Sequence, residues 1–131
     1  MTFIAAMKAL VIVLVAAFTA GCFGPLVPVA NLAQLSPAVR DSINTVEIYN
    51  QAQLTGRQFK VVTLVEGISC QNKLWDPAPS RAAAIEQAKY FALKAGATGI
   101  TNLQFGSNEG TSTRTNCWEL IRVSAEAIQL L

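Results

Sequence analysis

Residues Ser80–Gly99 read SRAAAIEQAKYFALKAGATG, and this stretch decides the fold. Its small and apolar side chains recur with the spacing of one helix face, at Ala84, Ile85, Ala88, Phe91, Ala92 and Ala95. Its charged side chains mostly fall elsewhere on the helix, at Arg81, Glu86, Lys89 and Lys94. Ser80 is a favourable N-cap residue and Gly96 a favourable terminator, so we predict a helix between them. We expect its alanine-rich face to pack closely against a sheet.

Four short runs rich in β-branched and aromatic residues flank this helix and predict strands: Val46–Tyr49, Phe59–Val65, Ile100–Phe105 and Cys117–Val123. The second run, FKVVTLV, indicates a central strand that is partly buried on both faces. The tail after Val123 either extends the last strand or forms a short helix. A strand, a crossover helix and a returning strand form a right-handed βαβ unit. The predicted fold is a small β-β-α-β-β domain of the α/β (α+β) class, with one main helix packed on a three- to four-stranded sheet.

Turn-forming residues separate these elements. Asn50–Gly56 predicts a connecting turn or a single helical turn. Gly67–Pro79, GISCQNKLWDPAP, predicts a loop because its two prolines forbid regular structure before the helix. Within it, the side chain of Trp75 either is exposed for contact or lies over the sheet. Gly106–Asn116 is polar and predicts an exposed hairpin loop.

The beginning of the chain is far less polar than the rest. Residues 1–30 contain a single charged side chain, Lys8, in a chain that is 52% apolar and 14% charged overall. Lys8, the apolar run Ala9–Phe18 and the small residues after it have the layout of a secretory signal. An uncleaved transmembrane anchor is the alternative, although glycines and prolines interrupt the apolar run. We expect a signal peptide at 1–21, a tether at 22–44 with a short helical turn at Pro37–Ile43, and a folded domain at 45–131.

Charge and composition exclude several classes of function. The formal net charge is +2 and the basic residues are scattered, which does not favour binding to nucleic acid. The chain has no histidine, which removes the commonest general base and the commonest metal ligand. We therefore expect no enzyme activity, no cofactor, no metal and no small-molecule substrate.

The chain has three cysteines, Cys22, Cys70 and Cys117. In an exported protein, Cys70 and Cys117 face an oxidising compartment and fall near one end of the predicted sheet, so we predict a disulfide between them. Closing the long loop between them would constrain the unfolded chain by about 4 kcal/mol. A redox-active pair or a pair of metal ligands is the alternative, which the lack of a Cys-x-x-Cys motif and of histidine disfavours.

The odd cysteine, Cys22, follows the predicted leader directly. Ala20-Gly21-Cys22 resembles the lipobox of bacterial lipoproteins, whose cysteine is acylated and becomes the first residue of the mature protein. Thr19 departs from the family, which usually has an aliphatic residue there. Members of this family are retained at the inner membrane when an aspartate follows the cysteine. Here Phe23 follows it, so the resemblance implies the outer membrane. A buried or free thiol is the alternative role of Cys22.

The segment Val46–Gln71, VEIYNQAQLTGRQFKVVTLVEGISCQ, resembles the core of the RcsF family of outer-membrane lipoproteins. The shared positions are spread over two strands and the turn between them: Ile48, Tyr49, Ala52, Leu54, Gly56, Phe59, Val65, Gly67, Ser69, Cys70 and Gln71. The resemblance continues through the alanine-rich helix and the motif AGATGI and ends near Cys117-Trp118, so it covers about Val46–Val123. The family has two disulfides. One matches Cys70 and Cys117, and the other falls near Phe105 and Val123, where an apolar contact would replace it.

The resemblance implies a sensor of envelope stress, lipid-anchored in the outer membrane on its periplasmic side and signalling to the Rcs phosphorelay. The implied partners are the barrel-assembly machinery, outer-membrane porins and an inner-membrane regulator of the phosphorelay. The tether is shorter than that of the family, whose long proline-rich segment is implicated in threading through barrel proteins. Exposed loops such as Gln71–Trp75 are the expected contact sites. The alternative function is a structural accessory lipoprotein of an envelope or secretion assembly.

Overall fold

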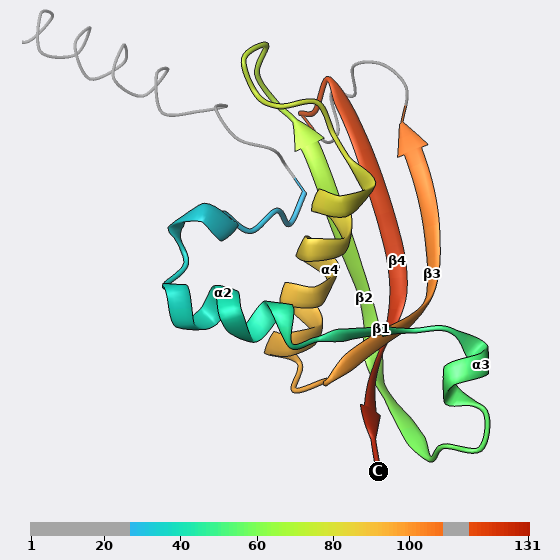
Figure 1. Ribbon diagram of the computed structural model, residues 1–131. Coiled ribbons are helices and arrows are strands. Elements are labelled where there is room, and N and C mark those ends of the chain that lie inside the picture. Colours follow the sequence, from blue (N-terminus) through green and yellow to red (C-terminus); the bar gives the residue numbers. More distant parts are fainter. Residues whose placement is uncertain (1–26, 109–115) are drawn as a thin grey trace, which may run out of the picture.

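The computed structural model describes residues 27–108 and 116–131 (Figure 1). In chain order its elements are η1 (Leu32–Gln34), α2 (Pro37–Asn44), β1 (Glu47–Tyr49), α3 (Gln51–Leu54), β2 (Phe59–Gln71), α4 (Arg81–Lys94), β3 (Gly99–Asn108) and β4 (Glu119–Leu130). The strands form one four-stranded sheet with helices packed on it, which confirms the predicted small α+β domain. The predicted signal peptide, Cys22 and most of the hairpin loop predicted at Gly106–Asn116 lie outside the described residues.

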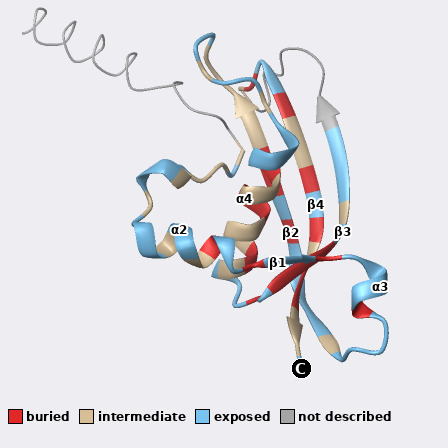
Figure 2. Ribbon diagram, viewed as in Figure 1, coloured by how far each residue is buried: buried red, intermediate tan, exposed pale blue. Residues whose placement is uncertain are grey.

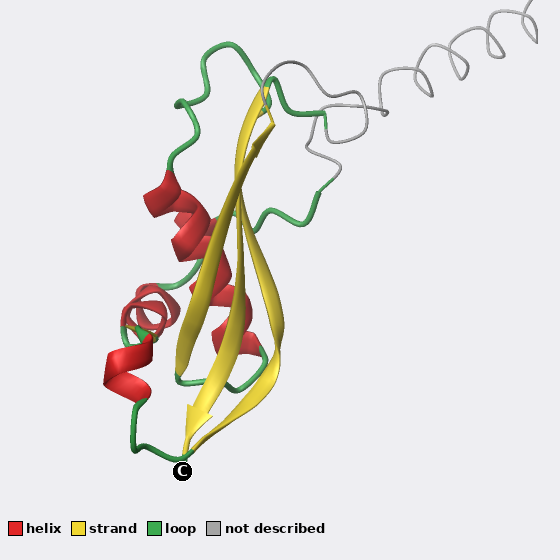
Figure 3. Ribbon diagram, turned by 90° about the vertical axis from the view of Figure 1, so that its right-hand side faces the viewer, coloured by secondary structure: helices red, strands yellow, loops and turns green. Residues whose placement is uncertain are grey.

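The strand order across the sheet is β1-β3-β4-β2. β1 runs parallel to β3, whereas β4 runs antiparallel to both β3 and β2. It follows that β2 and β3 are parallel to each other with β4 between them, so that α4 connects them by crossing over β4. Figure 3 shows that the three long strands twist strongly about one another and that α4 runs along them.

The close approach of α4 to the sheet depends on small residues in both layers. Ala84, Ala88 and Ala92 of α4 are completely buried. Opposite them, Gly67 of β2 has no room for a side chain, since a Cβ there would lie 1.9 Å from the carbonyl oxygen of Ala84. The expected alanine-rich face is therefore the face that meets the sheet, and it lets helix and strand backbones come into contact.

The ends of α4 follow the predicted capping residues. The Ser80 hydroxyl accepts a hydrogen bond from the amide of Ala83 at 3.0 Å. At the other end Gly96 adopts φ +82°, a left-handed conformation that glycine reaches without strain. This turn lets the amide of Ala97 bond the carbonyl of Ala92 at 3.0 Å, as in a Schellman motif. Local sequence thus fixes both ends of the helix.

The position of β2 differs from its prediction. The sequence predicts a central strand at Phe59–Val65, but β2 is an edge strand. The prediction is wrong because β4, the last element of the chain, inserts between β2 and β3 and takes the central place. Three apolar side chains in the first half of β2, Val61, Val62 and Leu64, are exposed, and this half of the strand is pale blue in Figure 2.

The length of β2 also differs from its prediction. The strand continues beyond Val65 to Gln71, so the loop that the sequence predicts from Gly67 begins only after Gln71. Gly67 does not break the strand here, because its role is to admit α4. At the end of the chain, the tail after Val123 extends the last strand to Leu130, the first of the two alternatives.

Part of the predicted tether has regular structure. The helical turn expected at Pro37–Ile43 is present as α2, and the Ser36 hydroxyl caps it by accepting a hydrogen bond from the amide of Val39 at 3.4 Å. α2 packs beside α4, and Ile43 near its end is only 2% exposed. The hydrophobic core therefore includes residues that precede the expected domain start at 45.

Candidate functional site

The predicted disulfide lies at one end of the sheet. Cys70 is the penultimate residue of β2, and Cys117 lies two residues before the start of β4. Their sulfur atoms are bonded, with the Cα atoms 5.6 Å apart. Cys117 is 1% exposed and packs with Ile68 and Leu120 in a small apolar cluster. The predicted pairing of Cys70 with Cys117 is confirmed, and the bond fixes the loop end of β2 to the beginning of β4.

Hydrogen bonds give the loop after β2 a defined shape. The carboxylate of Asp76 accepts from the amides of Asn72 at 3.1 Å and Lys73 at 2.8 Å. The side-chain amide of Gln71 donates to the carbonyl of Asp76 at 3.1 Å. The side chain of Asn72 donates to the carbonyl of Asn116 at 2.6 Å, which joins this loop to the segment before β4. The loop is therefore tied both to itself and to the neighbouring strand.

Three large apolar side chains project from this ordered region into solvent. Leu74 is 70% exposed, Trp75 80% and Trp118 46%. The ammonium group of Lys73 lies 5.8 Å from the centre of the Trp75 ring. Of the two alternatives for Trp75, the structure supports exposure for contact. We call Leu74, Trp75 and Trp118 the tryptophan surface.

The segment Val27–Ala30, which we call the strap, is held against the domain. The amide of Ala30 donates to Oε1 of Gln87 at 2.8 Å, and Nε2 of Gln87 donates to the carbonyl of Ala30 at 2.7 Å. Val27 and Val29 pack against the cluster that contains Ile68 and Cys117. The sequence analysis did not predict this contact. Gln87 is the one amide side chain in the alanine-rich helix, and a polar residue among buried alanines could have indicated a hydrogen-bonding partner elsewhere in the chain.

The strap connects the two faces of the sheet. Gly67 faces α4, so its neighbour Ile68 faces the other side, because side chains alternate along a strand. Val27 and Val29 contact the Ile68 side, whereas Ala30 contacts α4. The strap must therefore pass around the β2 edge, and Figure 1 places this first blue segment on the β2 side of α4.

This arrangement leaves little chain before the strap. Only residues 23–26 separate Cys22 from Val27. Five residue steps of fully extended chain span at most about 18 Å. Wherever Cys22 is attached, the disulfide end of the sheet must lie within that reach while the strap stays in place.

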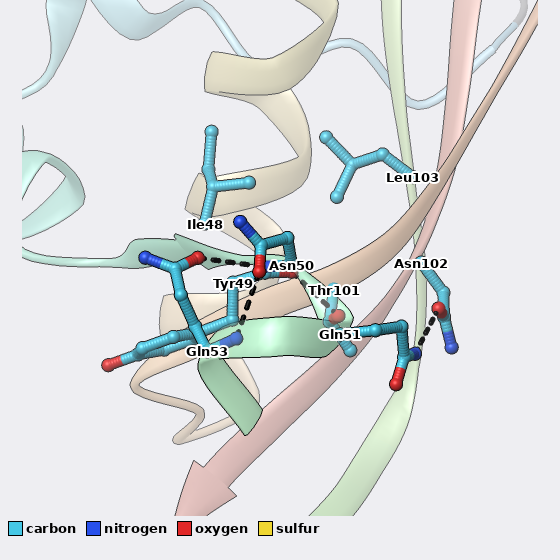
Figure 4. Close-up of a pocket in the computed structure, with 8 residues that line it drawn as sticks. All are labelled: Ile48, Tyr49, Asn50, Gln51, Gln53, Thr101, Asn102 and Leu103. Atoms are coloured by element: carbon cyan, nitrogen blue, oxygen red, sulfur yellow. Dashed lines mark hydrogen bonds between the residues drawn. The ribbon is translucent and has the colours of Figure 1, made fainter. Parts of the chain in front are cut away.

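A second feature is a hollow of about 400 Å³ between β1, α3 and β3 (Figure 4). Its lining residues are Ile48, Tyr49, Asn50, Gln51, Gln53, Thr101, Asn102 and Leu103. Asn50 and Gln53 form a capping box in which each side chain accepts from the other's backbone amide at 2.9 Å. Gln51 donates to Asn102 at 2.8 Å, which ties α3 to β3.

The chemistry available in this hollow is limited to hydrogen bonding. None of the eight lining residues is acidic or basic, so there is no carboxylate or amine to transfer a proton. A hydrogen bond to Glu47, together with burial, raises the pKa of Tyr49 above its ordinary value, so its hydroxyl stays protonated at neutral pH. The amides of the hollow hold α3 in place, and we assign it no catalytic role.

Neither a scan against protein-family models nor a comparison with curated proteins finds a match for this chain. Within residues 27–108 and 116–131, no helix is long and apolar enough to cross a membrane. In the same part of the chain, no group of three or more cysteine, aspartate or glutamate side chains is arranged to hold a metal ion. The strap, the disulfide and the tryptophan surface are thus the features on which a functional proposal can be based.

Proposed function

We propose that the protein is an outer-membrane lipoprotein, anchored through Cys22 on the periplasmic side, that senses envelope stress and signals by protein contact to the Rcs phosphorelay. The observation that carries the proposal is the Cys70–Cys117 disulfide, because such bonds persist in exported proteins and are rare in the cytosol. The leader-like residues before Cys22 support the membrane anchor, and the resemblance to the RcsF family supports the signalling pathway. The protein acts by binding alone, without a cofactor or a small-molecule substrate.

The proposed mechanism is conditional exposure. In unstressed cells the barrel-assembly machinery and porins hold the domain. When barrel assembly or the lipopolysaccharide layer fails, newly made copies remain free and reach an inner-membrane regulator, whose inhibition of the phosphorelay they relieve. The β2 edge suits this role, because Val61, Val62 and Leu64 are exposed on an ordered strand, and a preformed contact surface loses little conformational entropy on binding.

The strap adds a condition to this mechanism. While Ala30 is bonded to Gln87, the free chain after Cys22 is too short to cross the roughly 30 Å hydrocarbon core of a membrane. Threading of the tether through a barrel protein would therefore require the strap to leave the domain. Release of the strap would extend the tether from Cys22 as far as Ser36, the N-cap of α2.

A structural accessory lipoprotein is the second candidate, and the same short linker favours it. A domain held within about 18 Å of its anchor is placed to contact proteins of the same membrane. It is less well placed to contact a regulator in the opposite membrane. In that case the protein would support an envelope or secretion assembly without signalling.

In-cell photo-crosslinking distinguishes the two candidates. A photoreactive amino acid is placed at Leu74, on the loop after β2, and in a second strain at Leu64, on the β2 edge. These two positions are similarly exposed, at 70% and 75%, but lie on different surfaces. A sensor captures the inner-membrane regulator under envelope stress, and deletion of the protein abolishes the stress-reporter response. Capture of assembly components alone, together with an unchanged reporter after deletion, contradicts the sensor and supports the accessory role.

A further inference from the structure

Both tryptophans of the chain belong to one exposed surface. The sequence contains two tryptophans, Trp75 and Trp118, and they are 80% and 46% exposed. Leu74, beside Trp75, is 70% exposed. These side chains contribute little to the core, which is built elsewhere from alanine, valine and isoleucine. Large apolar groups that stabilise neither the core nor a strand pairing indicate a surface that meets another phase or molecule.

This surface lies at the same end of the sheet as the strap. Trp118 follows Cys117, and Val27 packs in the cluster to which Cys117 belongs. The amide of Trp118 donates to the carbonyl of Gln71 at 2.6 Å, at the base of the loop that carries Trp75. In Figure 1 the loop after β2 and the beginning of β4 lie together at the upper end of the sheet, above the start of the strap.

The length of chain before the strap points to what this surface meets. Val27 is five residues from Cys22, so a membrane that holds Cys22 lies within about 18 Å of this end of the sheet. That distance leaves no space for a folded partner between the tryptophan surface and the membrane. The end of the sheet that carries the tryptophans is therefore the end that faces the lipid.

The chemistry of the surface suits a lipid headgroup layer. Tryptophan concentrates at membrane–water interfaces, because its ring is apolar and its N–H still finds a polar partner. Leu74 supplies an aliphatic side chain that can reach the acyl boundary, and Lys73 supplies a positive charge for anionic headgroups. The hydrogen bonds of Asp76 already order the loop backbone, so that insertion exposes few unpaired amides to lipid.

We propose that Leu74, Trp75 and Trp118 insert into the headgroup region of the membrane that Cys22 anchors, and so fix the orientation of the domain on that membrane. This inference rests on the proposed anchoring through Cys22. It goes further in assigning a second, non-covalent lipid contact to the disulfide end of the sheet. The β2 edge, which carries the exposed Leu64, then stays accessible to proteins.

Tryptophan fluorescence tests the proposal directly, because the only tryptophans of the chain are in the surface itself. The acylated full-length mature protein is reconstituted into vesicles of phosphatidylethanolamine and phosphatidylglycerol whose acyl chains carry bromine close to the headgroup. We expect loss of tryptophan emission relative to unbrominated vesicles, and protection of both tryptophans from iodide in the water. The variants Trp75→Phe and Trp118→Phe leave one tryptophan each and report on the two side chains separately.

Leu74→Glu and Leu64→Glu form a matched pair of control variants, since the two leucines are similarly exposed. We expect Leu74→Glu to weaken the quenching by brominated lipid and Leu64→Glu to leave it unchanged. Emission that brominated lipid does not quench and iodide does quench, in a protein whose acylation is confirmed by mass, overturns the inference and leaves the anchor intact. An unmodified Cys22 in the mature protein overturns the proposed anchor and this inference together.

Discussion

The side-chain amide of Gln87 bonds both main-chain groups of Ala30, with an N···O distance of 2.8 Å from the Ala30 amide and of 2.7 Å to its carbonyl. Gln87 is 7% exposed and lies among the buried alanines of α4. A buried amide in such a place is costly unless it is hydrogen-bonded, and the strap supplies both bonds. The strap and the helix therefore stabilise each other.

We predict that Gln87→Leu releases the strap. The substitution removes two hydrogen bonds and leaves the Ala30 amide and carbonyl without these partners, which lowers the free energy of unfolding by about 2 kcal/mol. Denaturant unfolding measures this loss, and limited proteolysis shows the strap becoming cleavable while the domain stays folded. Gln104→Leu, at an exposed position of β3, is the control and is expected to change neither quantity. A strap that remains protected in Gln87→Leu would show that Val27 and Val29 hold it alone.

Gly67→Ala is predicted to be the most disruptive single-methyl substitution in the sheet. The new Cβ would lie 1.9 Å from the Ala84 carbonyl oxygen and 2.5 Å from the Ala88 amide nitrogen, and both are backbone atoms that cannot turn aside. Separating α4 from β2 enough to admit it lowers the free energy of unfolding by about 3 kcal/mol or more. The matched control is Gly106→Ala on β3, where a Cβ meets nothing within 4 Å. Equal stability of the two variants in denaturant titrations would contradict the backbone contact.

The disulfide is predicted to supply a large part of the stability. Cys70 and Cys117 are 47 residues apart, and replacing both with alanine releases a loop whose closure is worth about 4 kcal/mol in the chain-entropy model. Chemical denaturation with and without reductant measures the loss in the unchanged protein. Cys22→Ser is the control, and its unfolding is expected to respond to reductant as the parent does. Insensitivity of the parent to reductant would show that the bond contributes little.

Local signals in the sequence were enough to predict the main helix and the four strands, but not the order of the strands in the sheet. The helix Arg81–Lys94 was predictable because its cap, its terminator and its apolar spacing all lie within one stretch. The edge position of β2 was not, because it depends on where β4 inserts, and β4 is the most distant element in the sequence. A run of β-branched residues has the same sequence pattern whether it forms a buried central strand or an edge strand whose side chains are exposed.

In the candidate site, too, the sequence was enough to predict one contact and not the other. The Cys70–Cys117 pair was predictable, since both cysteines fall near one end of the predicted sheet and the expected export would place them in an oxidising compartment. The contact of Ala30 with Gln87 joins residues 57 apart in sequence, and the identity of either residue gives no indication of its partner. Proline-rich composition suggested a tether at Val27–Ala30, whereas the fold provides a buried amide that holds this segment in place.

Tyr49 is predicted to make the domain sensitive to alkaline pH. A hydrogen bond to Glu47, burial and the negative charge of Glu47 raise the pKa of Tyr49, while Arg57 acts in the opposite direction. A raised pKa means that the native state binds the phenolic proton more tightly than the unfolded state does. The contribution of Tyr49 to stability is therefore complete below about pH 10, the ordinary value for tyrosine, and is lost as pH rises through the native pKa. Stability measured as a function of pH is expected to fall less steeply in Tyr49→Phe than in the matched variant Tyr90→Phe, and identical curves would contradict the prediction.

Phe105 and Val123 are directly opposite each other on β3 and β4. The resemblance to the RcsF family implies that its second disulfide falls near these two positions. Cross-strand partners in an antiparallel pair have Cα atoms about 4.5–5.5 Å apart, within the range that a disulfide spans. We therefore predict that the double variant Phe105→Cys/Val123→Cys forms a second bond, seen by intact mass as the loss of two hydrogens under oxidising conditions.

The net effect of that double variant on stability tests whether an apolar contact has replaced a bridge. Val123 is completely buried, and Phe105 is 38% exposed with the Arg81 guanidinium 4.8 Å from its ring centre, so the reduced form loses packing at both sites. We expect the reduced variant to be less stable than the parent and the oxidised variant to recover most of the difference, because the bond offsets the lost packing by constraining the unfolded chain. Phe105→Cys and Val123→Cys alone are the controls, and each is expected to show the packing loss without recovery on oxidation. Two free thiols in the oxidised double variant would show that the strands do not present these residues in the geometry that the resemblance requires.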